Sequence, residues 1–151
     1  MKTTSAPQGC TNLKLRQLGR MVNRHYDQYL SVVGLKGTQY ALLSCVVKLG
    51  PMRPGDIARQ MQMDASTLSR NLQPMVAQGW LSVGAGEDAR SRLVEATPAG
   101  MALRTEAQRA WKAAQTALNQ RLGLAQVAAL HDLLDASIGI LDESRGGTLP
   151  R

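Results

Sequence analysis

Residues 53–99 read as two short helices followed by a charged β-hairpin, and this order constrains the fold more than any other feature of the chain. In the first helix, "RPGDIARQM", Pro54 suits the first helical position, where an amide would have no intrahelical partner. In the second helix, Ala65 to Gln78, Asp64 is expected to cap the first turn by accepting a hydrogen bond from a backbone amide. The order predicts a winged helix-turn-helix, a mainly α fold with a small β-hairpin wing.

The second of these helices has one apolar face and one face suited to nucleic acid. Helical spacing predicts that Leu68, Leu72, Met75 and Val76 pack inward. The remaining faces carry short hydrogen-bonding side chains and one arginine, which suit base edges and phosphates in a major groove. These predicted DNA-binding residues are Ser66, Thr67, Ser69, Arg70 and Asn71.

Two residues depart from the simplest pattern of such a unit. Gln62 occupies the turn between the two helices, where a left-handed residue is needed and glycine is favoured. Pro74 lies inside the second helix, where a proline removes one backbone hydrogen bond and costs about 3 kcal/mol in an ordinary helix interior. Because the apolar series continues beyond Pro74, we expect a bend and not the loss of the helix.

The predicted wing begins after Gly79, which supplies a left-handed stop for the helix. "WLSV" and "RLVEA" alternate as strands around the turn-rich "GAGEDARS". The tip carries Arg90, which could enter a minor groove, and Asp88, which would hold an arginine in place. Arg92 and Arg53 are expected to add phosphate contacts. Solvated hairpin charges would look similar, but their position directly after a helix-turn-helix favours DNA.

The rest of the chain is predicted to be long amphipathic helix. We expect one domain over residues 1–151, with dimerisation helices at 12–33 and 98–143 and a winged helix-turn-helix DNA-binding unit at 38–97. Thr38 and Thr97 are the expected caps of the helices that follow them. These long helices leave more apolar surface than one copy can cover, so we expect a homodimer that presents two recognition helices.

Composition agrees with a soluble globular domain. The chain is 44 % hydrophobic and 19 % charged, and we expect no transmembrane run, no secretory signal and no membrane partner, hence cytoplasmic residence. The net charge of +7 lies in residues 1–60, which hold nine Lys and Arg and two Asp. That distribution favours a polyanion. Alternatively, Arg16, Arg20 and Arg24, spaced four apart, form only the solvated face of a helix.

Several segments together resemble one protein family. "DIARQMQMDASTLSRNLQPMVAQGWL", then "EDARSR", with "DARS" fitting a D-x-R-S wing signature, and then "TPAG" opening a long helix, resemble the MarR family of bacterial transcriptional regulators. The resemblance covers nearly the whole chain. It implies a dimeric winged-helix repressor, less often an activator, that binds a pseudo-palindromic operator and is released by a phenolic or carboxylate ligand, a metal or an oxidant.

The resemblance also implies an effector pocket between the first two helices, the long fifth helix and the winged unit. Candidate lining residues by position are His25, Tyr26, Tyr29 and Tyr40, with Arg16, Arg20 or Arg24 available to meet a carboxylate. The alternative is that the three tyrosines are ordinary core residues whose hydroxyl groups find a partner.

Other classes of function receive less support. Cys10, just before the first helix, is a candidate redox or thiophilic-metal sensor, whereas Cys45 is expected to be a small core residue. No metal-site spacing, nucleophile motif or phosphate-binding loop is present, so we expect no enzyme and no cofactor. A winged-helix adaptor that binds protein but not DNA is a further alternative, which arginines at both helix and wing disfavour.

Overall fold

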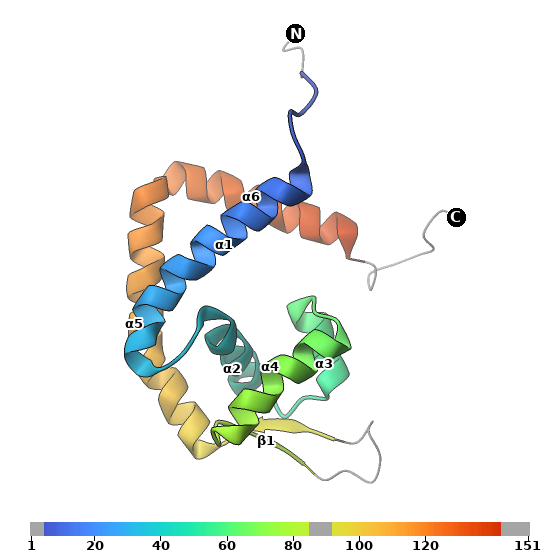
Figure 1. The fold of residues 1–151 in the computed structure, drawn as a ribbon, viewed down its shortest axis with the longest axis vertical. Coiled ribbons are helices and arrows are strands. Elements are labelled where there is room, and N and C mark those ends of the chain that lie inside the picture. Colours follow the sequence, from blue (N-terminus) through green and yellow to red (C-terminus); the bar gives the residue numbers. More distant parts are fainter. Residues whose placement is uncertain (1–4, 85–91, 143–151) are drawn as a thin grey trace, which may run out of the picture.

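The computed structural model describes residues 5–84 and 92–142, and it is a winged helix-turn-helix flanked by long helices (Figure 1). The predicted fold class is confirmed. The elements in chain order are α1 (Thr11–Leu30), the 3-10 helix η1 (Ser31–Val33), α2 (Gly37–Leu49), α3 (Pro54–Met61), α4 (Ala65–Ala77), β1 (Leu81–Val83), β2 (Val94–Ala96), α5 (Pro98–Leu122) and α6 (Leu124–Leu141).

The core of the winged unit lies between α2, α3, α4 and the two strands. Leu68, Leu72 and Met75 of α4 are buried, as predicted, and they belong to the same cluster as Ile57 of α3. Val76 was also expected to pack inward, and this expectation is wrong: its side chain is 38 % exposed. Successive helical residues are rotated by about 100°, so burial of Met75 turns Val76 toward the outer groove.

The two unusual positions of the helix-turn-helix are accommodated by the backbone. Gln62 takes the left-handed conformation, with φ at 54°, and the next amide, of Met63, donates to the Ala58 carbonyl at 2.8 Å. α4 continues through Pro74 to Ala77, so the expectation that the helix would survive this proline is confirmed.

The wing is a two-stranded antiparallel ribbon tied to the loop before α3. Leu81 pairs with Ala96 and Val83 with Val94. Met52 then exchanges two backbone hydrogen bonds with Val94, of 3.0 and 2.8 Å. This bridge fixes the base of the wing against the start of α3.

The junction between α4 and α5 is closely packed. The hydroxyl of Thr97 caps α5 by accepting from the Gly100 amide at 3.0 Å, as predicted. A Cβ at Gly100 would lie 2.0 Å from the carbonyl oxygen of Trp80, so only glycine allows this approach of α5 to the chain that leaves α4.

The expected cap of α2 is wrong. The helix begins at Gly37, with Lys36 as the N-cap, and not after Thr38. The Gly37 amide donates to Asp27 Oδ1 at 2.7 Å, and the Lys36 amide donates to Gln39 Oε1 at 2.9 Å. A carboxylate from α1 therefore adds to the local hydrogen bond from Lys36 to Gln39, and no local pattern in α2 indicates this contribution.

α6 leaves most of its apolar side chains uncovered. Val127 is its one buried residue in the described range, while Leu133, Ile138, Ile140 and Leu141 are 67, 54, 83 and 77 % exposed. α6 borders an apolar groove of about 320 Å³ with α1 and α5. By length and mean hydropathy, 1.4, α6 could cross a membrane. The expectation that no such run exists is therefore corrected.

Candidate nucleic-acid interface

The first turn of α4 is ordered by Asp64. Its Oδ1 accepts from the Thr67 amide at 2.7 Å and from the Ser66 hydroxyl at 2.8 Å. These hydrogen bonds, the backbone one foremost, hold the pKa of Asp64 below its ordinary value, so the carboxylate is charged at neutral pH. Its negative charge lies at the positive end of the helix dipole, and the predicted cap is confirmed.

The predicted DNA-binding residues of α4 divide into two groups. Ser66, Ser69 and Arg70 are exposed and form an open polar face. Thr67 and Asn71 are half-buried. The Asn71 amide donates to Met63 Sδ at 3.8 Å, and Arg70 Nη2 donates to Thr67 Oγ1 at 3.5 Å.

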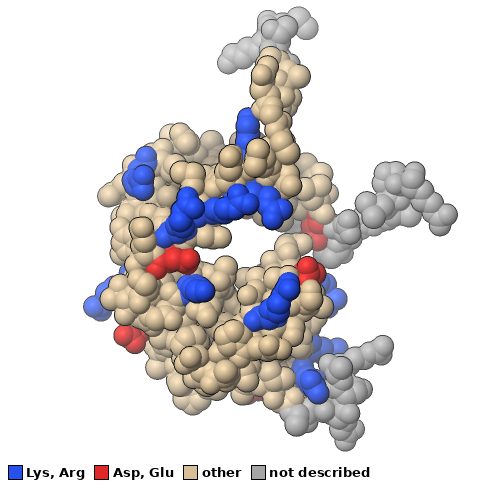
Figure 2. All heavy atoms as spheres, viewed as in Figure 1, with Lys and Arg blue, Asp and Glu red and all other residues tan. Residues whose placement is uncertain are grey.

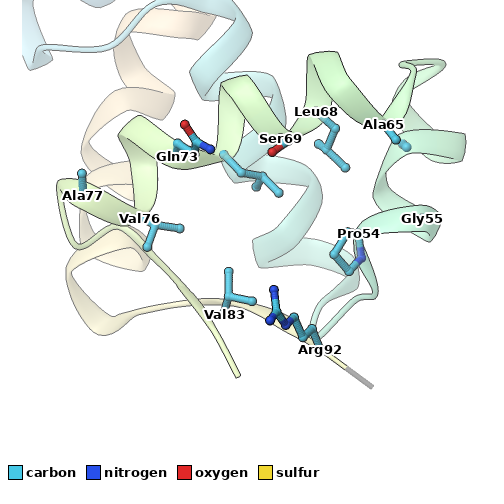
Figure 3. A pocket seen from close by; sticks show the side chains of 12 residues that line it. Pro54, Gly55, Ala65, Leu68, Ser69, Gln73, Val76, Ala77, Val83 and Arg92 are labelled. Carbon is cyan, nitrogen blue, oxygen red and sulfur yellow. The ribbon is translucent and has the colours of Figure 1, made fainter. Parts of the chain in front are cut away.

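An apolar groove separates α4 from the wing (Figure 3). Its volume is about 540 Å³, and it lies between α3, α4 and the strands. Ser69 and Gln73 line it from α4, and Arg92 extends into it from the strand side (Figure 3). Arg92 and Ser69 therefore line the same groove from opposite sides. Sequence reasoning missed Gln73, an exposed amide one turn after Ser69.

The other predicted DNA contacts lie further along the same unit. Arg53 is the N-cap residue of α3 and is exposed. The wing-tip residues Asp88 and Arg90 lie outside the described residues. Lys and Arg side chains also gather along α1, where it borders an opening between this helix and the winged unit (Figure 2).

A second cavity, of about 440 Å³, lies between α1, α2 and α5. Tyr26 and Tyr40, both predicted, are among its lining residues. The ring of Tyr40 stacks on Trp111 with centroids 5.9 Å apart. The Tyr26 hydroxyl donates to Gln115 Oε1 at 2.8 Å, and burial raises the pKa of this tyrosine.

The remaining predicted effector residues do not line this cavity. His25 Nε2 lies 2.8 Å from the carbonyl oxygen of Ala114, and its ring packs against Tyr29 with centroids 5.1 Å apart. Arg16 and Arg20 are exposed residues of α1 and are absent from the lining.

The cations of the cavity come from residues that sequence reasoning missed. Arg104 of α5 and Lys48 of α2 both line it, and Arg104 Nε donates to Ser44 Oγ at 3.4 Å. Neither cation pairs with a carboxylate within the described part of the chain. The available signal was weak: Arg104 directly follows Leu103 on the apolar stripe of α5, and Lys48 interrupts the apolar run of α2.

The two cysteines differ as predicted in exposure. Cys45 is buried, and its Sγ lies 3.9 Å from Met52 Sδ. Burial raises the pKa of its thiol. Cys10 is exposed and is the N-cap of α1, where its sulfur accepts from the Leu13 amide at 3.5 Å. Among the described residues, no three His, Cys, Asp or Glu side chains gather in a way that could hold a metal.

The fold and the polar face of α4 define a winged helix-turn-helix protein that binds DNA. A family model described as MarR family matches residues 33–91, which contain α2, α3, α4 and β1. The chain is similar to the MarR family of DNA-binding transcriptional regulators. Regulators of this family are generally not enzymes.

Three similar proteins support this assignment. An uncharacterized HTH-type transcriptional regulator of Bacillus subtilis, YwoH, is 29 % identical over 56 % of this chain, which spans 61 % of that protein's length. The multiple antibiotic resistance protein MarR of Salmonella typhimurium is 29 % identical over 81 % of this chain and 89 % of its own. The M. tuberculosis regulator MosR, solved in complex with DNA, has a TM-score of 0.69 and is 28 % identical, covering 85 % of this chain and 98 % of its own.

Proposed function

We propose that this chain is a homodimeric repressor that binds a pseudo-palindromic operator in the cytoplasm and leaves it when a small aromatic acid binds. The observation that carries the DNA-binding part is the exposed polar face of α4, with Ser66, Ser69 and Arg70, beside which Arg92 projects across the groove. Ser66, Ser69 and Arg70 would meet base edges in the major groove, with Thr67 and Asn71 flanking them. Arg92 and Arg53 would contact phosphates, which add affinity without sequence information.

The homodimer is supported by the uncovered helices at both ends of the chain. α1 exposes Leu13, Leu15 and Met21, and α6 exposes the residues given above. A second copy is the occupant that this surface favours, because Leu134, an exposed apolar residue of α6, also lines the groove between α1, α5 and α6. Residues 12–33 and 98–143 would then be the dimerisation helices and residues 38–97 the DNA-binding unit. Two recognition helices would read half-sites roughly 34 Å, or a multiple of this, apart.

The cavity between α1, α2 and α5 is the proposed effector site. Its two cations, Lys48 and Arg104, lack a carboxylate partner among the described residues, and Tyr40 and Trp111 supply aromatic surface. An aromatic carboxylate satisfies both features, because its ring would lie against aromatic side chains while its charge meets a cation.

The position of this cavity suits a switch. α2 packs against α3 and β2 within the winged unit, and α5 packs against α1, so a ligand between α2 and α5 would change the separation of two recognition helices in a dimer. The required coupling is small, since a 100-fold loss of affinity corresponds to about 2.7 kcal/mol. An effector that favours the DNA-incompatible form by this amount would relieve repression.

The decisive test is fluorescence anisotropy of the purified protein with the duplex immediately upstream of its own gene and with a scrambled duplex. The measurement is made at low and at near-physiological salt. We expect tight binding that prefers the native duplex and persists at the higher salt. Equal and salt-sensitive binding to both duplexes would mean that the protein binds DNA only through its charge and without sequence specificity. Binding to neither duplex would favour a protein adaptor.

A further inference from the structure

The hydrogen bonds at the start of α4 determine which atoms the Ser66 hydroxyl can offer to a ligand. Ser66 Oγ lies 2.8 Å from Asp64 Oδ1. A hydroxyl has one proton and two lone pairs, whereas an ionised carboxylate can only accept. The proton between these oxygens therefore belongs to Ser66, and its Oγ is left as an acceptor.

The hydrogen bond from the Ser66 hydroxyl to the Asp64 carboxylate is a strong one. Asp64 Oδ1 also accepts from the Thr67 amide, so the same oxygen holds both the cap of the helix and the hydroxyl. Hydrogen bonds to an ionised acceptor are roughly twice as strong as neutral ones. Releasing Ser66 to donate elsewhere would give up such a bond.

Ser66 is exposed at the second residue of α4, and the first residues of a recognition helix are those that contact base edges. In the major groove, the donors of hydrogen bonds are the exocyclic amines of adenine, N6, and cytosine, N4. Guanine N7 and O6, thymine O4 and phosphate oxygens are acceptors. An acceptor-only hydroxyl is therefore complementary to an amine and not to the other groups.

We infer that Ser66 is a specificity-determining residue that accepts a hydrogen bond from the exocyclic amine of adenine or cytosine. Asp64 is the positioning residue, because its carboxylate accepts the hydrogen bond that the Ser66 hydroxyl donates. This inference rests on the proposed function, because it requires α4 to enter the major groove. It also assigns Asp64 a second role in specificity: its carboxylate would repel a hydrogen-bond acceptor of a base that lies beside Ser66.

Ser69 provides a matched control. It is the same residue type, is exposed, and lies on the next turn of α4. Within the described residues its hydroxyl makes no hydrogen bond, so it is free to donate or to accept. The inference predicts a strict preference for an amine at the base that contacts Ser66. It predicts no such preference at the base that contacts Ser69, because the Ser69 hydroxyl can donate as well as accept.

The first experiment selects binding duplexes from a random pool with the wild-type protein, Ser66→Ala and Ser69→Ala. We expect Ser66→Ala to lose base preference at one pair of symmetry-related positions. At that position, a duplex is then made in which the contacted adenine is replaced by purine, or the cytosine by 2-pyrimidinone, so that only the amine is removed.

Removal of the amine should weaken binding of the wild type and of Ser69→Ala about fivefold, the worth of one ordinary hydrogen bond. Ser66→Ala should bind both duplexes equally. A second duplex has CH in place of N7, either in the contacted adenine or in the guanine paired with the contacted cytosine. This replacement should change the affinity of the wild type and of Ser66→Ala by the same factor. Loss on removal of N7 that depends on Ser66 would identify this hydroxyl as a donor and overturn the inference.

The role of Asp64 is tested with Asp64→Ser, which retains a good N-cap side chain. The serine hydroxyl can itself donate, so it no longer compels Ser66 to do so. We expect the preference for an amine at this position to relax while helix content, measured by circular dichroism, is retained. An unchanged preference would overturn the role of Asp64. If the wild type selects no sequence, the proposed function fails, whereas selection without any effect of Ser66→Ala contradicts the inference alone.

Discussion

The hydroxyl of Thr97 lies 2.6 Å from the carbonyl oxygen of Gly79 and donates to it across the junction between α4 and α5. The same oxygen caps α5 by accepting from the Gly100 amide. One side chain therefore joins the segment after the proposed recognition helix, α4, to the start of α5, which lines the proposed effector cavity. This connection is well placed to transmit a movement of α5 to α4.

Replacing Thr97 by valine should destabilise the fold. Valine keeps the shape of the side chain but removes the donor to Gly79 and the acceptor for Gly100. Loss of an N-cap side chain costs about 0.5–2 kcal/mol, and because the hydrogen bond to Gly79 is exposed, we expect urea denaturation to show a loss of this size. Thr97→Ser retains the hydroxyl and should remain within about 0.5 kcal/mol of the wild type. Equal losses in both variants would contradict a role for the hydroxyl.

Gly100→Ala should also destabilise the fold, because the new Cβ would lie 2.0 Å from the Trp80 carbonyl oxygen. Relief requires α5 to move away from the backbone, and overpacking of this kind typically costs about 1–3 kcal/mol. Gly55→Ala is the matched control, since a Cβ at this helical glycine meets no atom within 4 Å. It should be neutral or slightly stabilising in the same denaturation experiment.

A charge on α6 should dissociate the proposed homodimer. Ile138 is 54 % exposed in the single chain, and Ile138→Asp would place a carboxylate in an apolar interface. Light scattering should report a dimer for the wild type and a monomer for this variant at micromolar concentration. Leu49→Asp, at a 54 % exposed residue of α2 outside the proposed dimerisation helices, should remain dimeric. A wild type that is monomeric under these conditions would refute dimerisation.

Arg104→Gln should impair effector binding and leave DNA binding intact. With 4-hydroxybenzoate as the probe, quenching of the Trp111 fluorescence should require at least about tenfold more ligand in this variant, the worth of a charged hydrogen bond. Arg109→Gln, at an exposed residue of the same helix, is the control. The uncharged analogue 4-hydroxybenzamide should bind both variants alike. Equal binding of the acid to Arg104→Gln and wild type would exclude Arg104 from the site.

The two cysteines should react at different rates and pH. Exposed Cys10 should be alkylated by iodoacetamide in the native protein, whereas Cys45 should react only on unfolding, because burial raises the pKa of its thiol. A raised folded pKa means that the unfolded chain ionises first. The contribution of Cys45 to stability is therefore constant below its ordinary pKa of 9.0 and falls as the pH rises above it.

Mass spectrometry after alkylation at several pH values checks the reactivity of Cys10 and of Cys45, and urea denaturation at the same pH values checks the stability. The same protein tests redox sensing: peroxide that releases DNA from the wild type but not from Cys10→Ser would identify Cys10 as the sensor. Release in both variants would exclude it.

Local patterns were read correctly where a neighbouring residue decides the structure. Asp64 caps α4 and Thr97 caps α5 because each side chain reaches an amide three residues ahead in its own segment. Thr38 failed as a cap because α2 begins one residue earlier, at Gly37, whose amide donates to Asp27 of another helix. Val76 failed because the groove beside the wing, and not the helical spacing alone, decides which side of α4 is covered.

The amino-acid sequence by itself determined the order of the helices and strands, the caps of α4 and α5, the burial of Cys45 and the polar face of α4, because these depend on periodicity and on contacts a few residues apart. Tertiary structure alone decided which cations line the cavity between α1, α2 and α5. Arg104 and Ser44 are sixty residues apart, and only the packing of α5 against α2 brings them within hydrogen-bond distance.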